Sequence, residues 1–155
     1  MNYPNLSEII KYHPYHIHTF ANFANVTQRL MEAALIGKEK LTEKELSGIA
    51  KYTGIPFSVL QCRKLIVLNK NNYRHRKMIQ TLEEYLRVIW TMEKRGSREA
   101  AHYMKYRRID YVNMALDFQN KKSITYGRYL GIREAMEQTL DFIHSEQIKP
   151  RDIRA

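Results

Sequence analysis

The chain has little cysteine, proline or glycine: it holds one cysteine, four prolines and six glycines among 155 residues. A single cysteine, Cys62, cannot form an internal disulfide, which excludes a small scaffold held together by disulfides. No apolar run approaches the roughly 18 residues that a membrane-spanning helix needs. The first residues also lack the basic and apolar stretches of a signal peptide. We therefore expect a cytoplasmic protein that does not enter a membrane.

Common motifs of catalysis and metal binding are also missing. There is no Gly-rich phosphate loop, Walker motif or zinc-ligand spacing. His13, His16 and His18 lie close together, but no cysteine or carboxylate accompanies them, which favours surface histidines over a metal site. Cys62 has no recognisable His or Asn partner, and a free cysteine is usually a small buried hydrophobe. The sequence therefore predicts no enzyme, no cofactor and no metal.

Positive charge is what the chain has in excess. Lysine and arginine number 26 against 16 aspartates and glutamates, a formal net charge of +10. Residues 1–66 hold eight basic and five acidic residues, a net of +3, and residues 67–155 hold 18 and 11, a net of +7. Such a balance favours a polyanionic partner, but it leaves DNA, RNA and an acidic membrane face open.

Apolar residues recur at helical spacing nearly throughout, so the expected fold is all-α. Start signals divide residues 1–66 into five short helices. The signals are, in order, Asn5 with Glu8 for the first helix, Thr27 as N-cap of the third, Thr42 with Glu45 as a capping box for the fourth, and Pro56 in the first turn of the fifth.

The second half of the chain is predicted to form a separate helical domain. Residues 67–76 are expected to be a basic connector, residues 77–146 a dimerisation or interaction domain, and residues 147–155 a flexible tail. Three longer helices fit the domain, over about residues 77–94, 98–119 and 125–145. The first has an apolar face broad enough to pack on more than one side, which favours a homodimer.

Residues 20–36 have the residue types that a helix-turn-helix needs. That motif requires a small residue in its first helix, a residue tolerant of positive φ at the turn, and an apolar residue that locks the second helix. Ala21, Asn25 and Met31 supply these three features. Gln and Arg side chains on the second helix match the edges of adenine and guanine. The residues left facing outward there are Thr27, Gln28, Arg29, Glu32 and Ala33.

In this arrangement the chain resembles the Cro/C1-type helix-turn-helix domain of phage repressors, the XRE family. The resemblance covers about residues 3–62. It is carried by Tyr3-Pro4-Asn5-Leu6, Phe20-Ala21, Asn25-Val26, Met31, Leu35-Ile36-Gly37-Lys38, and a stretch from Leu41-Thr42 to Leu60 that includes Gly54-Ile55-Pro56. It implies a five-helix lambda-repressor-like domain in a sequence-specific regulator of transcription. Such a regulator binds double-stranded DNA as a homodimer, with half-sites about one helical turn apart.

The chain departs from the family at positions that face DNA. Where members have Thr-Gln at the start of the second helix, this chain has His16-Ile17, so His18 is the expected substitute contact. A basic stretch after such a domain often lies along the phosphate backbone, which suggests the same for Arg74, Arg76 and Lys77. The predicted DNA-binding residues are therefore His18, Thr27, Gln28, Arg29, Glu32, Lys38, Arg74, Arg76 and Lys77.

A second register of the same motif is possible further along the chain. Ile49-Ala50, Gly54-Ile55 and Leu60 have the required spacing, which would make Ser58, Gln61, Arg63 and Lys64 the groove contacts. We prefer the first register because the second places Pro56 and Phe57 where polar contacts belong.

Two other function classes remain open. A degenerate helix-turn-helix could serve as a protein-interaction module. Tyrosines alternate with lysine and arginine over residues 103–111, a pattern that suits single-stranded nucleic acid. We favour the simpler interpretation that these tyrosines lie at the boundary of a helical core.

Overall fold

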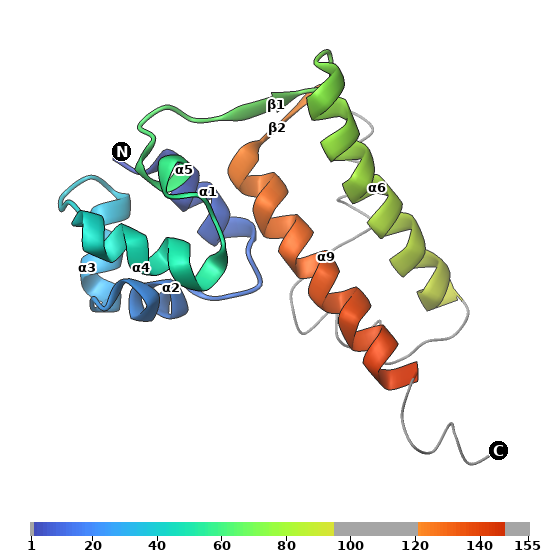
Figure 1. The fold of residues 1–155 in the computed structure, drawn as a ribbon, viewed down its shortest axis with the longest axis horizontal. Coiled ribbons are helices and arrows are strands. Elements are labelled where there is room, and N and C mark those ends of the chain that lie inside the picture. Colours follow the sequence, from blue (N-terminus) through green and yellow to red (C-terminus); the bar gives the residue numbers. More distant parts are fainter. Residues whose placement is uncertain (1, 95–120, 148–155) are drawn as a thin grey trace. The chain divides into compact units, whose positions relative to one another are not determined.

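The computed structural model describes residues 2–94 and 121–147, and in those ranges the protein is mostly helical (Figure 1). The described elements are seven helices and one two-stranded sheet, which confirms the expected predominance of helix. The helix expected over residues 98–119, including the tyrosine-rich stretch, lies outside the described residues. Within the described ranges, no helix has the length and apolar character needed to cross a membrane.

The chain divides into two compact units. The first comprises residues 1–68 and 124–131, and the second comprises residues 69–123 and 132–155. The first unit is therefore assembled from two stretches of chain that are far apart in sequence.

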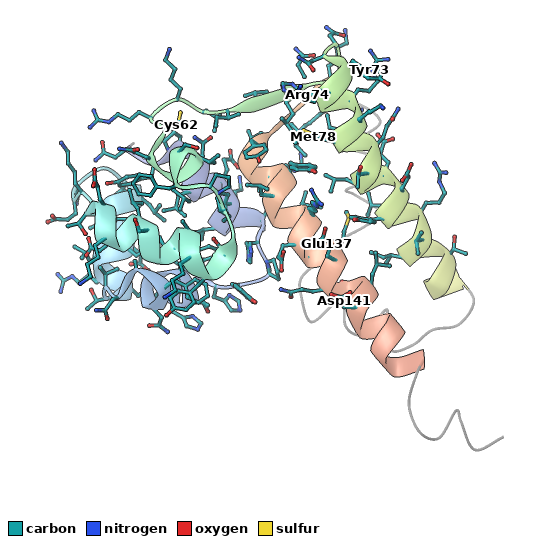
Figure 2. The ribbon with its side chains drawn as sticks, in the orientation of Figure 1. Cys62, Tyr73, Arg74, Met78, Glu137 and Asp141 are labelled. Atoms are coloured by element: carbon teal, nitrogen blue, oxygen red, sulfur yellow. The ribbon has the colours of Figure 1, made fainter. Side chains whose placement is uncertain are left out.

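Five helices form the N-terminal part of the first unit. They are α1 (Pro4–Tyr12), α2 (Ile17–Ala24), α3 (Gln28–Leu35), α4 (Glu43–Thr53) and α5 (Phe57–Gln61). The predicted capping box is present, since the Glu45 N–H donates to Thr42 Oγ1 at 3.1 Å and the Thr42 N–H donates to Glu45 Oε1 at 2.8 Å. Pro56 is expected in the first turn of the fifth helix. It lies just before that turn, at the N-cap of α5. Cys62 follows α5 and is half-buried (Figure 2).

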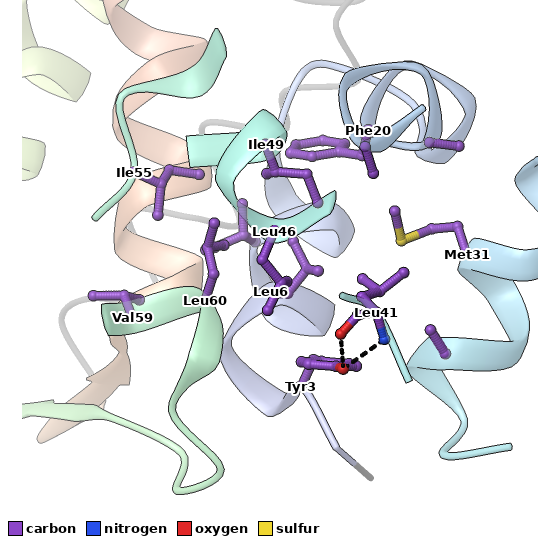
Figure 3. Close-up of a cluster of buried hydrophobic side chains, with 14 residues drawn as sticks. Tyr3, Leu6, Phe20, Met31, Leu41, Leu46, Ile49, Ile55, Val59 and Leu60 are labelled. Atoms are coloured by element: carbon purple, nitrogen blue, oxygen red, sulfur yellow. Dashed lines mark hydrogen bonds between the residues drawn. The ribbon is translucent and has the colours of Figure 1, made fainter. Parts of the chain in front are cut away.

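The core of the first unit lies between these helices (Figure 3). Its large, fully buried side chains are Leu6, Ile9, Phe20, Met31, Ile49 and Leu60. Burying one such side chain stabilises a fold by about 1.5–3 kcal/mol. The Tyr3 hydroxyl accepts the Leu41 N–H at 2.7 Å and donates to the Leu41 carbonyl at 3.4 Å. The Tyr3 side chain therefore links the N-terminal residues to the loop before α4 through two hydrogen bonds.

Asn5 holds the chain that leaves α5. It lies inside α1 rather than at its start, and its side chain is completely buried. Its Oδ1 atom accepts the Ile66 N–H at 2.9 Å, and its Nδ2 atom donates to the Lys64 carbonyl at 2.9 Å. One side chain thus satisfies backbone groups of a segment about sixty residues away, which a helix-start signal does not predict.

Two short strands form a sheet that the helical periodicity of the sequence does not predict. The strands β1 (Val67–Asn69) and β2 (Ser123–Thr125) pair in antiparallel register. The Lys70 N–H donates to the Lys122 carbonyl at 2.9 Å, and the Tyr126 N–H donates to the Ile66 carbonyl at 2.8 Å. This register places the buried Leu68 opposite the buried Ile124. Strands of three residues are too short for the alternation that identifies a strand in a sequence.

Helix α6 (Tyr73–Lys94) begins inside the stretch expected to be a connector. Its buried side chains include Ile79, Leu82, Leu86 and Ile89, which keep the predicted helical period. Helix α9 (Tyr126–Gln147) begins within one residue of its predicted start. Its first residues belong to the first unit and its remainder to the second.

Two glycines let the start of α9 approach α1 closely. A Cβ atom at Gly127 would lie 2.7 Å from the Asn5 carbonyl oxygen, and one at Gly131 would lie 2.8 Å from the His13 nitrogen. Real Cβ atoms do not approach backbone atoms so closely, so each position requires glycine. Tyr126 and Leu130 pack against the core of the first unit. Residues 124–131 therefore complete the unit that contains α1–α5.

Candidate nucleic-acid interface

Helices α2 and α3 are joined by a tight turn at Asn25. This residue has φ 58° and ψ 43°, the left-handed conformation. Apart from glycines, no other residue in the described ranges has a positive φ. Asparagine adopts this conformation more readily than most residues because its short polar side chain can hydrogen-bond locally. The turn is closed by the Val26 N–H, which donates to the Ala21 carbonyl at 3.0 Å.

The buried face of α3 packs against α2, as the predicted motif requires. Met31 and Ala34 are fully buried on α3, and Ala21 and Ala24 are buried on α2. The methyl side chains of the two α2 alanines leave room for α3 to cross at short distance. Helix α2 also packs against α4, so α2 lies between α3 and α4 in this part of the unit.

The outward face of α3 carries the predicted polar residues. Thr27, Gln28, Arg29 and Glu32 are all exposed. Thr27 is the N-cap, and its Oγ1 atom accepts the Leu30 N–H at 3.1 Å. The Gln28 side chain donates from Nε2 to Glu32 Oε1 at 3.0 Å. The structure therefore places four of the predicted contacts together on the exposed face of α3 and at its N-cap.

His18 and Lys38 lie at the two ends of this motif. His18 is exposed in the first turn of α2, and its ring stacks on His16 with centroids 5.8 Å apart and planes inclined by 15°. Lys38 is exposed after the C-terminal end of α3, where its N–H donates to the Ala33 carbonyl at 2.9 Å. Among the described residues, no three or more histidine, cysteine, aspartate or glutamate side chains are grouped so that they could hold a metal ion.

The other three predicted contacts belong to the second unit. Arg74, Arg76 and Lys77 are exposed near the N-terminal end of α6, where Figure 2 labels Arg74. The Arg76 Nε atom donates to the Lys70 carbonyl at 3.0 Å, and the Lys77 ammonium lies 4.8 Å from the centre of the Tyr73 ring. These residues are helical, not part of an extended connector.

Residues of the alternative register are also exposed, but their helix is short. Helix α5 ends at Gln61 after five residues, so Arg63 and Lys64 lie beyond it. Phe57 is half-buried and Val59 is buried. Only Ser58 and Gln61 therefore remain as exposed polar side chains of the alternative set on this helix.

Comparison of the chain with protein-family models, curated protein sequences and solved structures finds no match in any of the three. The geometry of α2, Asn25 and α3 is therefore the main guide to the chain's function.

Proposed function

We propose that the chain is a sequence-specific regulator of transcription that binds double-stranded DNA. In this proposal α1–α5 form a lambda-repressor-like domain, and α3 is the helix that enters the major groove. The observation that supports it most is the combination of the left-handed Asn25, the buried Ala21 and Met31, and the exposed polar face of α3. A helix that reads DNA needs this division between a locked inner face and a polar outer face.

The chemistry of α3 suits base recognition. Arg29 can donate two parallel hydrogen bonds to O6 and N7 of guanine, and Gln28 can pair with N6 and N7 of adenine. Each such bidentate contact contributes about 1–3 kcal/mol of discrimination against a wrong base. Glu32 can accept a hydrogen bond from the amino group of cytosine. Phosphate contacts from His18, Thr27 and Lys38 would hold the helix in register without selecting a sequence.

A homodimer is part of the same proposal. A single small DNA-binding domain contacts too few base pairs to be selective alone. Val88 on α6 is 48% exposed, although it lies on a helix with an extensive buried face. We place Val88 at the contact with a second protomer, whose two-fold symmetry would match a pseudo-palindromic site.

One experiment separates the preferred register from the alternative. The double variant Gln28→Ala/Arg29→Ala removes the proposed base contacts, and Gln61→Ala/Arg63→Ala removes the same two residue types near α5. Both are compared with the wild type on random duplex, random single strand and the DNA next to the chain's own gene. We expect only the first variant to lose its preference among duplexes. Loss in the second variant alone would assign recognition to α5.

A protein-interaction module is the second candidate, and one observation favours it. Ile36 is 63% exposed at the C-terminal end of α3, where the phage repressors that the sequence resembles have a polar residue. An exposed isoleucine beside the recognition helix would suit an apolar partner better than a phosphate. If the wild type binds no duplex above the level of a random polyanion, this second function replaces the first.

A further inference from the structure

Six basic residues meet at one end of the two-stranded sheet. The segments 69–77 and 121–125 are joined there by the hydrogen bond from the Lys70 N–H to the Lys122 carbonyl, which is 2.9 Å long. Neither segment contains an aspartate or glutamate. The basic cluster consists of Lys70, Arg74, Arg76, Lys77, Lys121 and Lys122. All six residues belong to the second unit.

The basic cluster lies at a helix end where positive charge is disfavoured. It surrounds the N-terminal end of α6, a helix of 22 residues whose first turn contains no acidic residue. The positive end of a helix dipole favours acidic side chains and disfavours lysine and arginine. The nearest acidic residue on α6 is Glu83, whose Oε1 atom lies 3.9 Å from Lys70 Nζ. An external polyanion would complement the positive charge gathered at this helix end.

The side chains of the basic cluster suit phosphate groups better than bases. Five of the six side chains are exposed, three of them on the first turns of α6 and two just before β2, where they present charge without a rigid pocket. The Arg76 Nε atom donates to the Lys70 carbonyl at 3.0 Å, and its terminal amino groups are further donors that a phosphate could accept. Asn71 and Asn72 in the intervening turn are exposed and add neutral polar groups.

We propose that the basic cluster binds the phosphodiester backbone of duplex DNA, an inference that rests on the proposed function. Duplex DNA carries about one negative charge per 1.7 Å of its axis, so a row of cations drawn from two segments can engage several phosphates. The cluster adds affinity and salt dependence, and it leaves base preference to α3. Lys121 and Lys122 are its distinctive members, because only the strand pairing brings them to α6.

The test uses the full chain and the variant Lys121→Gln/Lys122→Gln. Losing two phosphate contacts should lower the slope of log affinity against log salt concentration by about 1.8, since each contact contributes about 0.9. Affinity for preferred and random duplex should fall by the same factor. The variant Lys121→Arg/Lys122→Arg keeps the charge and should keep the wild-type slope. Arg87→Gln removes a charge from an exposed position further along α6 and serves as the matched control.

The possible outcomes separate this inference from the proposed function. An unchanged slope in Lys121→Gln/Lys122→Gln, with duplex binding intact, overturns the inference alone. Loss of binding to phosphatidylglycerol vesicles with unchanged duplex affinity would assign the cluster to a membrane surface and also overturn it. Lys121→Gln/Lys122→Gln could behave as expected while Gln28→Ala/Arg29→Ala keeps its base preference. In that case the basic cluster binds phosphates as proposed, and the role proposed for α3 is wrong. A wild type that binds no duplex overturns both.

Discussion

The side chain of Gln28 donates a hydrogen bond to Glu32 Oε1 at 3.0 Å, one turn further along α3. The bond leaves the Gln28 carbonyl oxygen and one amide hydrogen for other partners. It also holds a carboxylate on the surface that we propose faces DNA. Pairs of this kind stabilise a helix only slightly, by about 0.2–0.5 kcal/mol. Their larger consequence here concerns selectivity, because a carboxylate repels phosphates and accepts only from amino groups of bases.

Replacing Glu32 by glutamine should therefore raise affinity and lower selectivity. The substitution Glu32→Gln removes the repulsion, and we expect random duplex to bind about two- to five-fold more tightly, as for other exposed charges. Preferred duplex should gain less, so the ratio of the two affinities falls. Fluorescence anisotropy with both duplexes measures the ratio. Weaker binding to random duplex would show that Glu32 does not face the phosphates.

The left-handed turn between α2 and α3 predicts a steric response at Asn25. The substitution Asn25→Val places a β-branched residue at φ 58° and should destabilise the protein by about 1–2 kcal/mol. Asn25→Gly removes the strain and should be neutral or slightly stabilising. Urea denaturation of the full chain measures both. Equal stability of the two variants would contradict the turn geometry.

The contact between α9 and α1 predicts that the C-terminal half of the chain stabilises the N-terminal unit. The substitution Gly127→Ala would push a methyl group against Asn5 and Ile9 backbone atoms less than 3 Å away. We expect a loss of about 1–3 kcal/mol in the free energy of unfolding. The control Arg133→Ala changes an exposed residue of the same helix and should cost less than about 0.5 kcal/mol. A neutral Gly127→Ala would mean that α9 does not complete the first unit.

The sequence predicted local features well and distant pairings poorly. The N-cap at Thr27, the capping box of Thr42 and the turn at Asn25 depend on residues within a few positions of one another, and the structure confirms all three. Asn5 resembles a helix start, but its buried amide binds Lys64 and Ile66. Such a role depends on a contact between segments far apart in sequence, so no local pattern could reveal it.

In the candidate site, too, the features that depend on neighbouring residues could be predicted, and those that depend on distant segments could not. Outward exposure of Gln28 and Arg29 follows from the helical period of α3, and the structure bears it out. The basic cluster could be predicted only in part, because Arg74, Arg76 and Lys77 are adjacent in sequence and Lys122 is not. Pairing of β1 with β2 brings Lys122 to Lys70, and strands of three residues leave no periodic signal.

Dimerisation gives a prediction that does not depend on the DNA sequence. We expect the full chain to sediment as a dimer at tens of micromolar, on the order of the concentrations at which moderate protein interfaces saturate. Val88→Glu places a charge on the exposed apolar position of α6 and should shift the protein toward monomer. Analytical ultracentrifugation measures both species. A monomeric wild type at this concentration would contradict the proposed dimer.

Selection from a random duplex library shows whether α3 reads the sequence of duplex DNA. The full chain is used to enrich bound duplexes, which are then sequenced, and Gln28→Ala/Arg29→Ala is carried through the same selection. We expect an enriched pseudo-palindrome with half-sites about one helical turn apart. We also expect the variant to lose the preference at base pairs within each half-site. An enriched site that is identical for wild type and variant, or no enrichment by the wild type, would contradict this role of α3.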